Sequence, residues 1–183
     1  INLFGIKILT DASADITSSA TATQSSIYSG KESEFGPGLL LDGNHEKRRD
    51  GTDLTMVHTL DGNDEWVEVD LGNSYKLSKI IIYNRPGWPT RINGAILTLE
   101  NSSGTTIFSQ EISGIIQDTT DINNNNSEIQ FVYSNASNAS NTTISYSGSL
   151  STSVRKIKIS HSGNFINLFG IKILTDASAD ITS

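Results

Sequence analysis

The first eighteen residues of this 183-residue chain return as its last eighteen. Residues 1–18 read INLFGIKILTDASADITS and residues 166–183 read the same, so the two copies start 165 residues apart. Chance does not produce an identity of this length, and we infer a window cut from a longer array of near-identical 165-residue repeats. An engineered duplication, a single terminal duplication, and a chain of one repeat and a little more remain as alternatives.

The repeated segment contains a candidate strand. Leu3–Leu9 alternates enough to bury Ile6 and Ile8 on one face of a sheet. One domain has one slot for this strand, so the copies at 1–9 and 166–174 cannot both occupy it. The other copy must then complete a neighbouring repeat, pack on another chain, or remain exposed as an unpaired strand edge.

This reasoning predicts a division into three segments. Residues 1–18 are the last strand and linker of a preceding identical repeat, residues 19–175 are the domain itself, and residues 176–183 lead into the next repeat. The linker Thr10–Ser18 has no Pro or Gly and carries Asp11 and Asp15, which predicts an extended, solvated segment. Adjacent copies of the repeat are therefore expected partners.

Composition excludes several classes of protein. Apolar residues make up 36% and charged residues 18%, which is too polar for a membrane protein and too apolar for a disordered one. No apolar run is long enough to span a bilayer. The net charge of −7 and the lack of a basic stripe exclude nucleic acid as a partner. The chain has no cysteine and therefore forms no disulfide. Its cysteine content does not indicate whether the protein resides in an oxidising or a reducing compartment.

Short alternating segments with dense turn signals predict an all-β fold, a β-sandwich or jelly roll. Residues 28–56, 119–128 and 134–149 are predicted as loops, the last two because they are rich in Asn, Ser and Thr. The predicted strands are Trp66–Leu71, Leu77–Tyr83, Ala95–Leu99, Thr105–Ile112, Ile129–Tyr133, Val154–Ile159 and the strand at 166–174.

Motifs from residue 42 onward carry a resemblance to a known family. They are Asp42-Gly43-Asn44, Val57-His58-Thr59, Trp66–Gly72, Tyr75, Lys79–Arg85, Arg91–Ala95 and Gly163–Leu168. In this order they resemble the F-type lectins, the fucose-binding branch of the discoidin-like sandwiches, over about residues 19–175. The resemblance implies a discoidin-like, F-type-lectin-like β-sandwich that binds glycans.

The family's sugar signature is H-x26-R-x-D-x4-R/K. Here His58 and Arg85 have 26 residues between them, but Gly87 stands where the family has Asp, and Arg91 comes one residue early. The resemblance implies a sugar site of His58, Arg85, Arg91 and Trp88, in which the guanidinium and imidazole groups bond the hydroxyls and the indole covers the C–H face. Alternatively, Arg85 pairs with a surface carboxylate and Trp88 plugs the end of the sandwich.

The family also carries calcium, and Asp42, Asn44 and Thr55 match positions of that site. Oxygen ligands of this kind suit Ca²⁺. The family's acidic ligand in the last strand falls at Gly170, although Asp50 or Asp53 could substitute. The alternative is that Asp42-Gly43-Asn44 is only a tight turn.

Five N-x-S/T sequons are candidate glycosylation sites. Three cluster in one loop, at Asn135, Asn138 and Asn141, and the others are Asn101 and Asn125. A plain polar loop is the alternative for the cluster.

No catalytic motif is present, so we expect no enzyme. Two functions remain open. The first is a carbohydrate-binding, fucose-type module of a secreted tandem-repeat protein that mediates cell adhesion through many weak sites. The second is a building block of an extracellular fibre or filament with a vestigial sugar site, since identical interfaces propagate.

Overall fold

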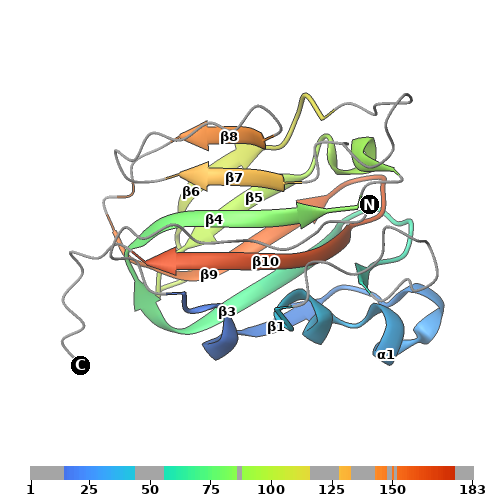
Figure 1. Ribbon diagram of the computed structural model, residues 1–183, viewed down its shortest axis with the longest axis horizontal. Helices are drawn as coiled ribbons and strands as arrows, with labels where there is room; N and C mark the ends of the chain where they lie inside the picture. The colour runs from blue at the N-terminus through green and yellow to red at the C-terminus, as the bar shows by residue number, and fades with distance from the viewer. Residues whose placement is uncertain are drawn as a thin grey trace.

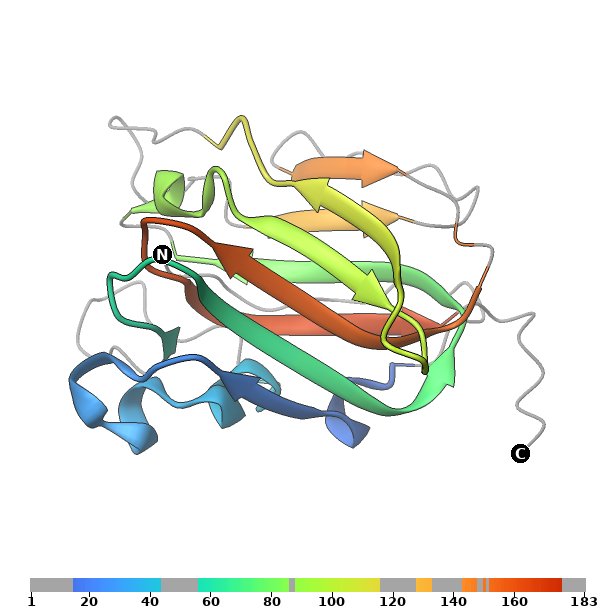
Figure 2. The ribbon, with the colours of Figure 1, turned by 180° about the vertical axis from the view of Figure 1, so that it is seen from behind.

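The computed structural model describes residues 15–43, 56–85, 88–115, 128–132, 143–147, 150 and 152–175. Ten strands form two five-stranded sheets packed face to face (Figures 1 and 2). The predicted all-β sandwich is thus confirmed. Every described strand pair is antiparallel except β7 with β8. No helix among the described residues has the length and apolar character to cross a membrane.

The first sheet has the order β1-β3-β9-β5-β6, and the second has the order β2-β10-β4-β7-β8. The strands are β1 Thr21–Gln24, β2 Val57–His58, β3 Glu65–Tyr75, β4 Leu77–Asn84, β5 Ile96–Glu100, β6 Thr106–Glu111, β7 Glu128–Val132, β8 Thr143–Ser147, β9 Val154–His161 and β10 Asn167–Thr175. Five short helical segments join them: η1 Thr17–Ser19, η2 Tyr28–Gly30, α1 Glu32–Phe35, η3 Pro37–Leu40 and η4 Pro89–Ile92.

The main core lies between the two sheets and follows the period-two alternation of the strands. In β3, Val67, Val69 and Leu71 are buried while the residues between them are partly exposed. A second, smaller apolar cluster covers the outer face of the β10 sheet, where Phe35 of α1 packs with Phe169 of β10. Strand β10 is therefore buried on both faces.

The C-terminal copy of the repeated segment forms β10. This strand lies between β2 and β4, and both Ile171 and Ile173 are fully buried in the main core. The predicted burial of these two positions is confirmed for this copy. Residues 1–14, which hold the other copy of the strand, lie outside the described residues.

The end of the first copy contacts the last residues of β10, which lie in the middle of the second copy. Ile16 N donates to Ile173 O (3.1 Å), Ile173 N donates to Thr17 Oγ1 (2.8 Å), and Lys172 Nζ lies 3.0 Å from Asp15 Oδ2. Our prediction of a solvated linker is therefore wrong for Thr17, which is buried, whereas Asp15 is exposed. The physical reason is that these residues satisfy backbone groups of β10 that its neighbouring strands leave unpaired.

Three strands were absent from the prediction. β1 and β2 are short, at four and two residues, and β8 lies inside the segment 134–149 that we predicted as a loop. The backbone of β8 pairs with β7 from Glu128 with Thr143 to Val132 with Ser147. Thr, Ile and Tyr of β8 are strand formers, but the Asn- and Ser-rich surroundings obscured them.

The predicted loop 28–56 contains helical turns. It contributes more residues to the two apolar clusters than the leucines at 39–41, which were its expected core residues. Leu40 is fully buried in the main core, and Phe35 and Met56 belong to the outer cluster. Residues 44–55 of this stretch lie outside the described residues.

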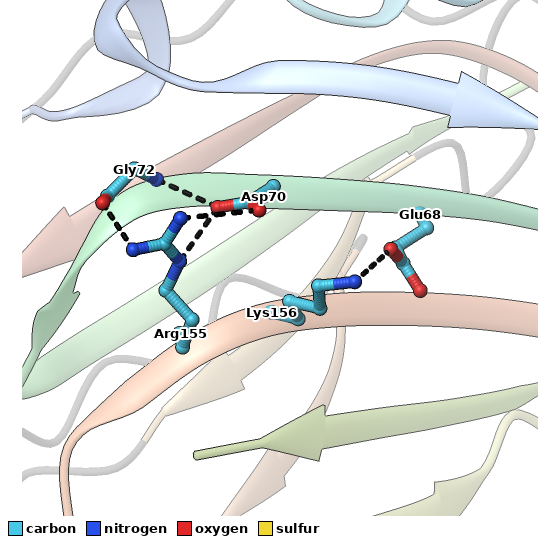
Figure 3. A network of polar contacts seen from close by, with 5 residues as sticks. All are labelled: Glu68, Asp70, Gly72, Arg155 and Lys156. Atoms are coloured by element: carbon cyan, nitrogen blue, oxygen red, sulfur yellow. Dashed lines mark hydrogen bonds and ion pairs between the residues drawn. The ribbon is translucent and has the colours of Figure 1, made fainter. Parts of the chain in front are cut away.

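An ion-pair network joins β3 to β9 where β3 becomes irregular (Figure 3). Arg155 donates to both carboxylate oxygens of Asp70, at 2.7 and 3.2 Å, and also to the carbonyl of Gly72. Lys156 Nζ donates to Glu68 at 2.7 Å. These contacts hold the register of the two central strands beside an irregularity between Asp70 and Tyr75.

Candidate functional site

The candidate sugar residues gather at one end of the sandwich. His58 ends β2, Arg85 follows β4, and Asn167 opens β10 opposite His58. In Figure 1 this is the right-hand end, where α1 and the short helix η4 also lie, and β10 runs from there to the left-hand end. Antiparallel pairing of β10 with β2 and β4 brings these positions together although they are far apart in sequence.

A buried asparagine shapes the loop between Arg85 and Arg91. Asn84 is fully buried, and its Nδ2 donates to Pro89 O at 3.1 Å. Pro89 opens η4, and Arg91 N donates back to Trp88 O at 3.2 Å. The loop is thus closed on itself, so Arg85 and Arg91 approach the same indole ring.

Six side chains form a continuous series of ring contacts, which we call the arginine–aromatic row. Its members, in contact order, are Tyr28, His58, Phe165, Arg91, Trp88 and Arg85. The successive separations are 4.3 Å between the Tyr28 and His58 rings, 5.2 Å from His58 to Phe165, 4.9 Å from the Arg91 guanidinium to Phe165, 4.9 Å from Arg91 to Trp88, and 4.1 Å from Arg85 to Trp88. All four predicted sugar residues belong to it.

Exposure differs along the row. Trp88 and Tyr28 are exposed by 48% and 39%, whereas His58 is only 5% exposed. His58 lies beneath Tyr28, Phe35 and Phe165. Tyr28 and Trp88 are therefore accessible to solvent near the two ends of the row, and the imidazole lies deeper.

The imidazole of His58 is held in one tautomer. Its Nδ1–H donates to Thr59 O at 2.6 Å, which leaves Nε2 as the acceptor of the neutral ring. Burial lowers the pKa of His58, the Thr59 carbonyl opposes this shift, and Arg91 adds to it. His58 is thus neutral at pH 7, and no described residue hydrogen-bonds its Nε2.

The two arginines of the row are partly buried and lack a carboxylate partner among the described residues. Arg91 Nη1 donates to Asn167 Oδ1 at 3.3 Å, and Arg85 contacts the Trp88 ring without a hydrogen bond to a described residue. Burial, with a further contribution from Arg91, lowers the pKa of Arg85 to about 10. Stacking on an aromatic face offsets part of the lost hydration, and most guanidinium N–H groups stay available to a ligand.

Sequence reasoning missed four contributors: Tyr28, Asn84, Phe165 and Asn167. Phe165 and Asn167 fall within a motif that we assigned only to the last strand, and Asn84 directly precedes Arg85. An aromatic residue just before an apolar strand was the available signal for Phe165. Tyr28 lies thirty residues before His58, and only the fold brings the two rings together.

The calcium prediction falls mostly outside the described residues. Asn44 and Thr55 are not described, and neither are Asp50 and Asp53. Asp42 supplies one carboxylate, while Gly170 offers no side-chain oxygen, and the described residues contain no group of three His, Cys, Asp or Glu that could hold a metal. The described part of the chain does not form such a site by itself, and calcium stays a prediction.

Of the five sequons, only Asn101 is described. It lies in the turn between β5 and β6, where its Oδ1 accepts from Ser103 N, Ser103 Oγ and Thr105 N. These bonds leave its Nδ2, the atom that a glycan would modify, unused. Asn125, Asn135, Asn138 and Asn141 lie outside the described residues.

Comparison with known proteins decides the family. The model of the F5/F8 type C family, described as a NedA-like, galactose-binding domain, matches residues 40–159, which is more than half of the chain. The chain belongs to this family. The match begins before the calcium candidates and ends within β9, so it spans most strands of this F5/F8 type C sandwich. No curated protein matches the chain.

Solved structures extend the similarity over nearly the whole sandwich. A fucose-binding module of Streptococcus pneumoniae, SpX-3, is 20% identical with a TM-score of 0.65, over 89% of this chain and 98% of that one. The lectin domain of lectinolysin, solved with Lewis B antigen, is 18% identical with a TM-score of 0.63, over 92% and 99%. A fucolectin from striped bass (Morone saxatilis) serum is 18% identical with a TM-score of 0.61, over 89% of this chain and 47% of that one.

These neighbours share the fold of this F5/F8 type C domain. The predicted resemblance to the F-type lectin and discoidin-like sandwiches is confirmed at the level of family and fold. The family match makes the chain a galactose-binding-type domain.

Proposed function

We propose that the arginine–aromatic row binds a saccharide of the fucose type. The observation that carries this proposal is that His58, Arg85, Arg91 and Trp88 belong to one contact series at one end of the sandwich. Trp88 offers its exposed face to the C–H groups of a sugar ring. Guanidinium N–H groups donate to the hydroxyls, and neutral His58 accepts through Nε2.

The similar structures support this choice of ligand. They include a fucose-binding module, a fucolectin, and a lectin domain in complex with Lewis B antigen. Their identity to this chain is low, so the row itself is the main support. We propose binding without catalysis.

Calorimetry with fucose and galactose, followed by a glycan array, tests the proposal. Arg91→Ala removes charge-assisted hydrogen bonds of about 1.5–3 kcal/mol, so affinity should fall roughly 10–100-fold. Lys158→Ala is the matched control, because Lys158 stacks on Trp66 at 5.2 Å on the other sheet. Equal affinity of Arg91→Ala and the control would contradict the proposal, as would an unmodified chain that binds no glycan.

We further propose that this module is one 165-residue unit of a tandem array. Asp15–Thr17 dock on the end of β10, and the same Asp-Ile-Thr sequence recurs at residues 180–182. In an array, residues 180–182 of one repeat would dock on β10 of the next. Only residues 176–179 would then separate two sandwiches.

This linker fixes the arrangement of neighbouring modules. From Thr175 to Asp180 the chain has five residue steps, which reach at most about 17 Å when fully extended. Because Asp15 pairs with Leu174, the chain would enter and leave each module at the same end. The row lies at the other end of β10, about 27 Å away for a nine-residue strand. Sugar sites would therefore point away from the attachment line.

Such an array suits adhesion through many weak sites. A chain with residues 11–175 present twice in tandem should dissociate from a glycan-coated surface roughly 10²–10⁴-fold more slowly than the single module. Surface plasmon resonance measures both rates. Equal rates on a densely coated surface would contradict simultaneous engagement.

A secreted or cell-surface location fits this role, and one similar structure is a serum protein. The alternative is a fibre subunit, in which neighbouring copies cover the row. Labelling of Trp88 with an indole reagent distinguishes the two, since the indole stays reactive in an adhesive array and is protected in a fibre.

A further inference from the structure

The row holds positive charge that no described carboxylate neutralises. The four ion pairs among the described residues use Lys31, Arg155, Lys156 and Lys172. Neither Arg85 nor Arg91 takes part in one. The chain has 20 carboxylate residues against 13 basic ones, and yet the sequence from Arg85 to Arg91 contains no Asp or Glu. Within the described part of this acidic chain, the two cations therefore stand out because they have no carboxylate partner.

The two guanidiniums lie close enough to repel one another. Both lie within 5 Å of the centre of the Trp88 ring, at 4.1 and 4.9 Å. Burial and, to a smaller extent, the charge of Arg91 together lower the pKa of Arg85 to about 10. A cation in this environment favours an opposite charge within about 4–6 Å.

A neutral sugar cannot relieve this electrostatic strain. Its hydroxyls accept hydrogen bonds from the arginines but leave both charges uncompensated. A carboxylate or sulfate accepts shorter, charge-assisted bonds that are roughly twice as strong, and the planar guanidinium matches both groups. Two other members of the row remain for contacts with a sugar ring: the partly exposed indole of Trp88 and the acceptor Nε2 of His58.

We propose that the row prefers an acidic saccharide, one that carries a carboxylate or sulfate group bound by Arg85 and Arg91. This inference rests on the proposed function, because it names the ligand class of the same site. The sugar ring packs on Trp88 while the anionic group neutralises the arginine pair.

Calorimetry with matched ligands tests the inference on the whole chain. The probes are galacturonic acid, its neutral methyl ester, galactose, and galactose 3-sulfate, each at 50 and 500 mM NaCl. We expect the acid to bind at least about tenfold more tightly than its ester at low salt, with a smaller ratio at high salt. The sulfated and carboxylated sugars distinguish the two sources of negative charge.

Two variants locate the preference. Arg85→Gln should reduce the ratio of acid to ester affinity toward one, while some affinity for the ester remains. Lys158→Gln, which removes a stacked cation from the other sheet, should leave the ratio unchanged. If Arg85→Gln does not fold, the comparison of acid with ester on the unmodified chain still tests the preference for an acidic saccharide.

Each outcome separates this inference from the proposed function. Equal affinity for the acid and the ester, or for galactose and its sulfate, overturns the acidic preference and leaves saccharide binding intact. Binding of inorganic sulfate as tightly as of the sulfated sugar overturns the acidic saccharide in favour of a simple anion site. Failure to bind any of the four sugars overturns the acidic preference, and the proposed function falls only if fucose does not bind either.

Discussion

Replacement of Arg85 by Met should leave the sandwich as stable as before or make it more stable. Arg85 is partly buried, has no carboxylate partner among the described residues, and contacts mainly the Trp88 ring. Methionine retains much of the apolar volume of the arginine stem and removes the charge. A substitution at a partly buried position usually destabilises a protein by about 1 kcal/mol, so a neutral or favourable effect is a specific expectation.

The pKa of Arg85 gives the size of the effect. A decrease from 12.5 to about 10, caused first by burial and then by Arg91, corresponds to about 3 kcal/mol at roughly 1.4 kcal/mol per unit. Solvent screening of the partly exposed guanidinium reduces this to about 1–2 kcal/mol. Loss of the stacking on Trp88 subtracts about 0.5–1 kcal/mol. The net change in the free energy of unfolding at pH 7 is then a gain of about 0–1.5 kcal/mol.

Urea denaturation of two methionine variants is the assay. Arg155→Met is the matched control, because Arg155 is also partly buried but donates to Asp70 and to the Gly72 carbonyl. Its removal should lower the free energy of unfolding by about 1 kcal/mol. If Arg85→Met loses as much stability as Arg155→Met, the charge of Arg85 is paired in solution and the electrostatic reasoning is refuted.

Three other measurements test the sandwich and the state of His58. Ile173→Ala empties a fully buried position in β10 and should lower the free energy of unfolding in urea by about 2–4 kcal/mol, whereas a loss under about 1 would contradict its place in the core. The hydrogen bonds from Arg155 and Gly72 lower the pKa of Asp70, so its ion pair stabilises the fold above the unfolded pKa of about 3.9 and is lost as pH falls through the lower folded pKa. Melting temperatures of Asp70→Asn and the unmodified chain should therefore differ at pH 7 and converge as the pH falls through the folded pKa of Asp70, and a constant gap would argue against the pair. Burial lowers the pKa of His58, against the Thr59 carbonyl and together with Arg91, so stability should decrease as pH falls below about 6.5 toward the folded pKa; a ring-proton NMR titration with a midpoint at or above about 6.5 would refute this.

Strands with strict alternation could be predicted from sequence because burial on one face leaves a period of two. β3 and β9 carry this period over many residues and pair with each other. β2 has only two residues and β8 lies among Asn and Ser. In neither strand is the apolar–polar alternation long or clear enough to predict a strand from sequence. Their position depends on β10 and β7, which supply the hydrogen-bonding partners.

The site was predictable only as far as its motif reached. His58, Arg85, Trp88 and Arg91 were predicted through the resemblance to the F-type lectin signature, but Tyr28 and Phe165 contact His58 through the fold alone. The burial of the His58 side chain could not be predicted from sequence either, because nothing in Val57-His58-Thr59 indicates that the imidazole lies beneath aromatic rings. The burial of Arg85 and its lack of a carboxylate partner became visible only with the side chains in place.

The repeated eighteen residues have different roles at their two ends. The first part, as β10, supplies Asn167 beside the row and Ile171 and Ile173 to the core. The last part, as Asp15–Thr17, holds the opposite end of that strand through Ile173 and Lys172. In the proposed array one copy of this sequence completes one sandwich and begins the next. In that arrangement, folding of one module would position the first residues of its neighbour, and the short linker between them would limit how far two rows can separate. This coupling would give the proposed adhesive array linked sites from a single repeated sequence, without a separate interface between modules.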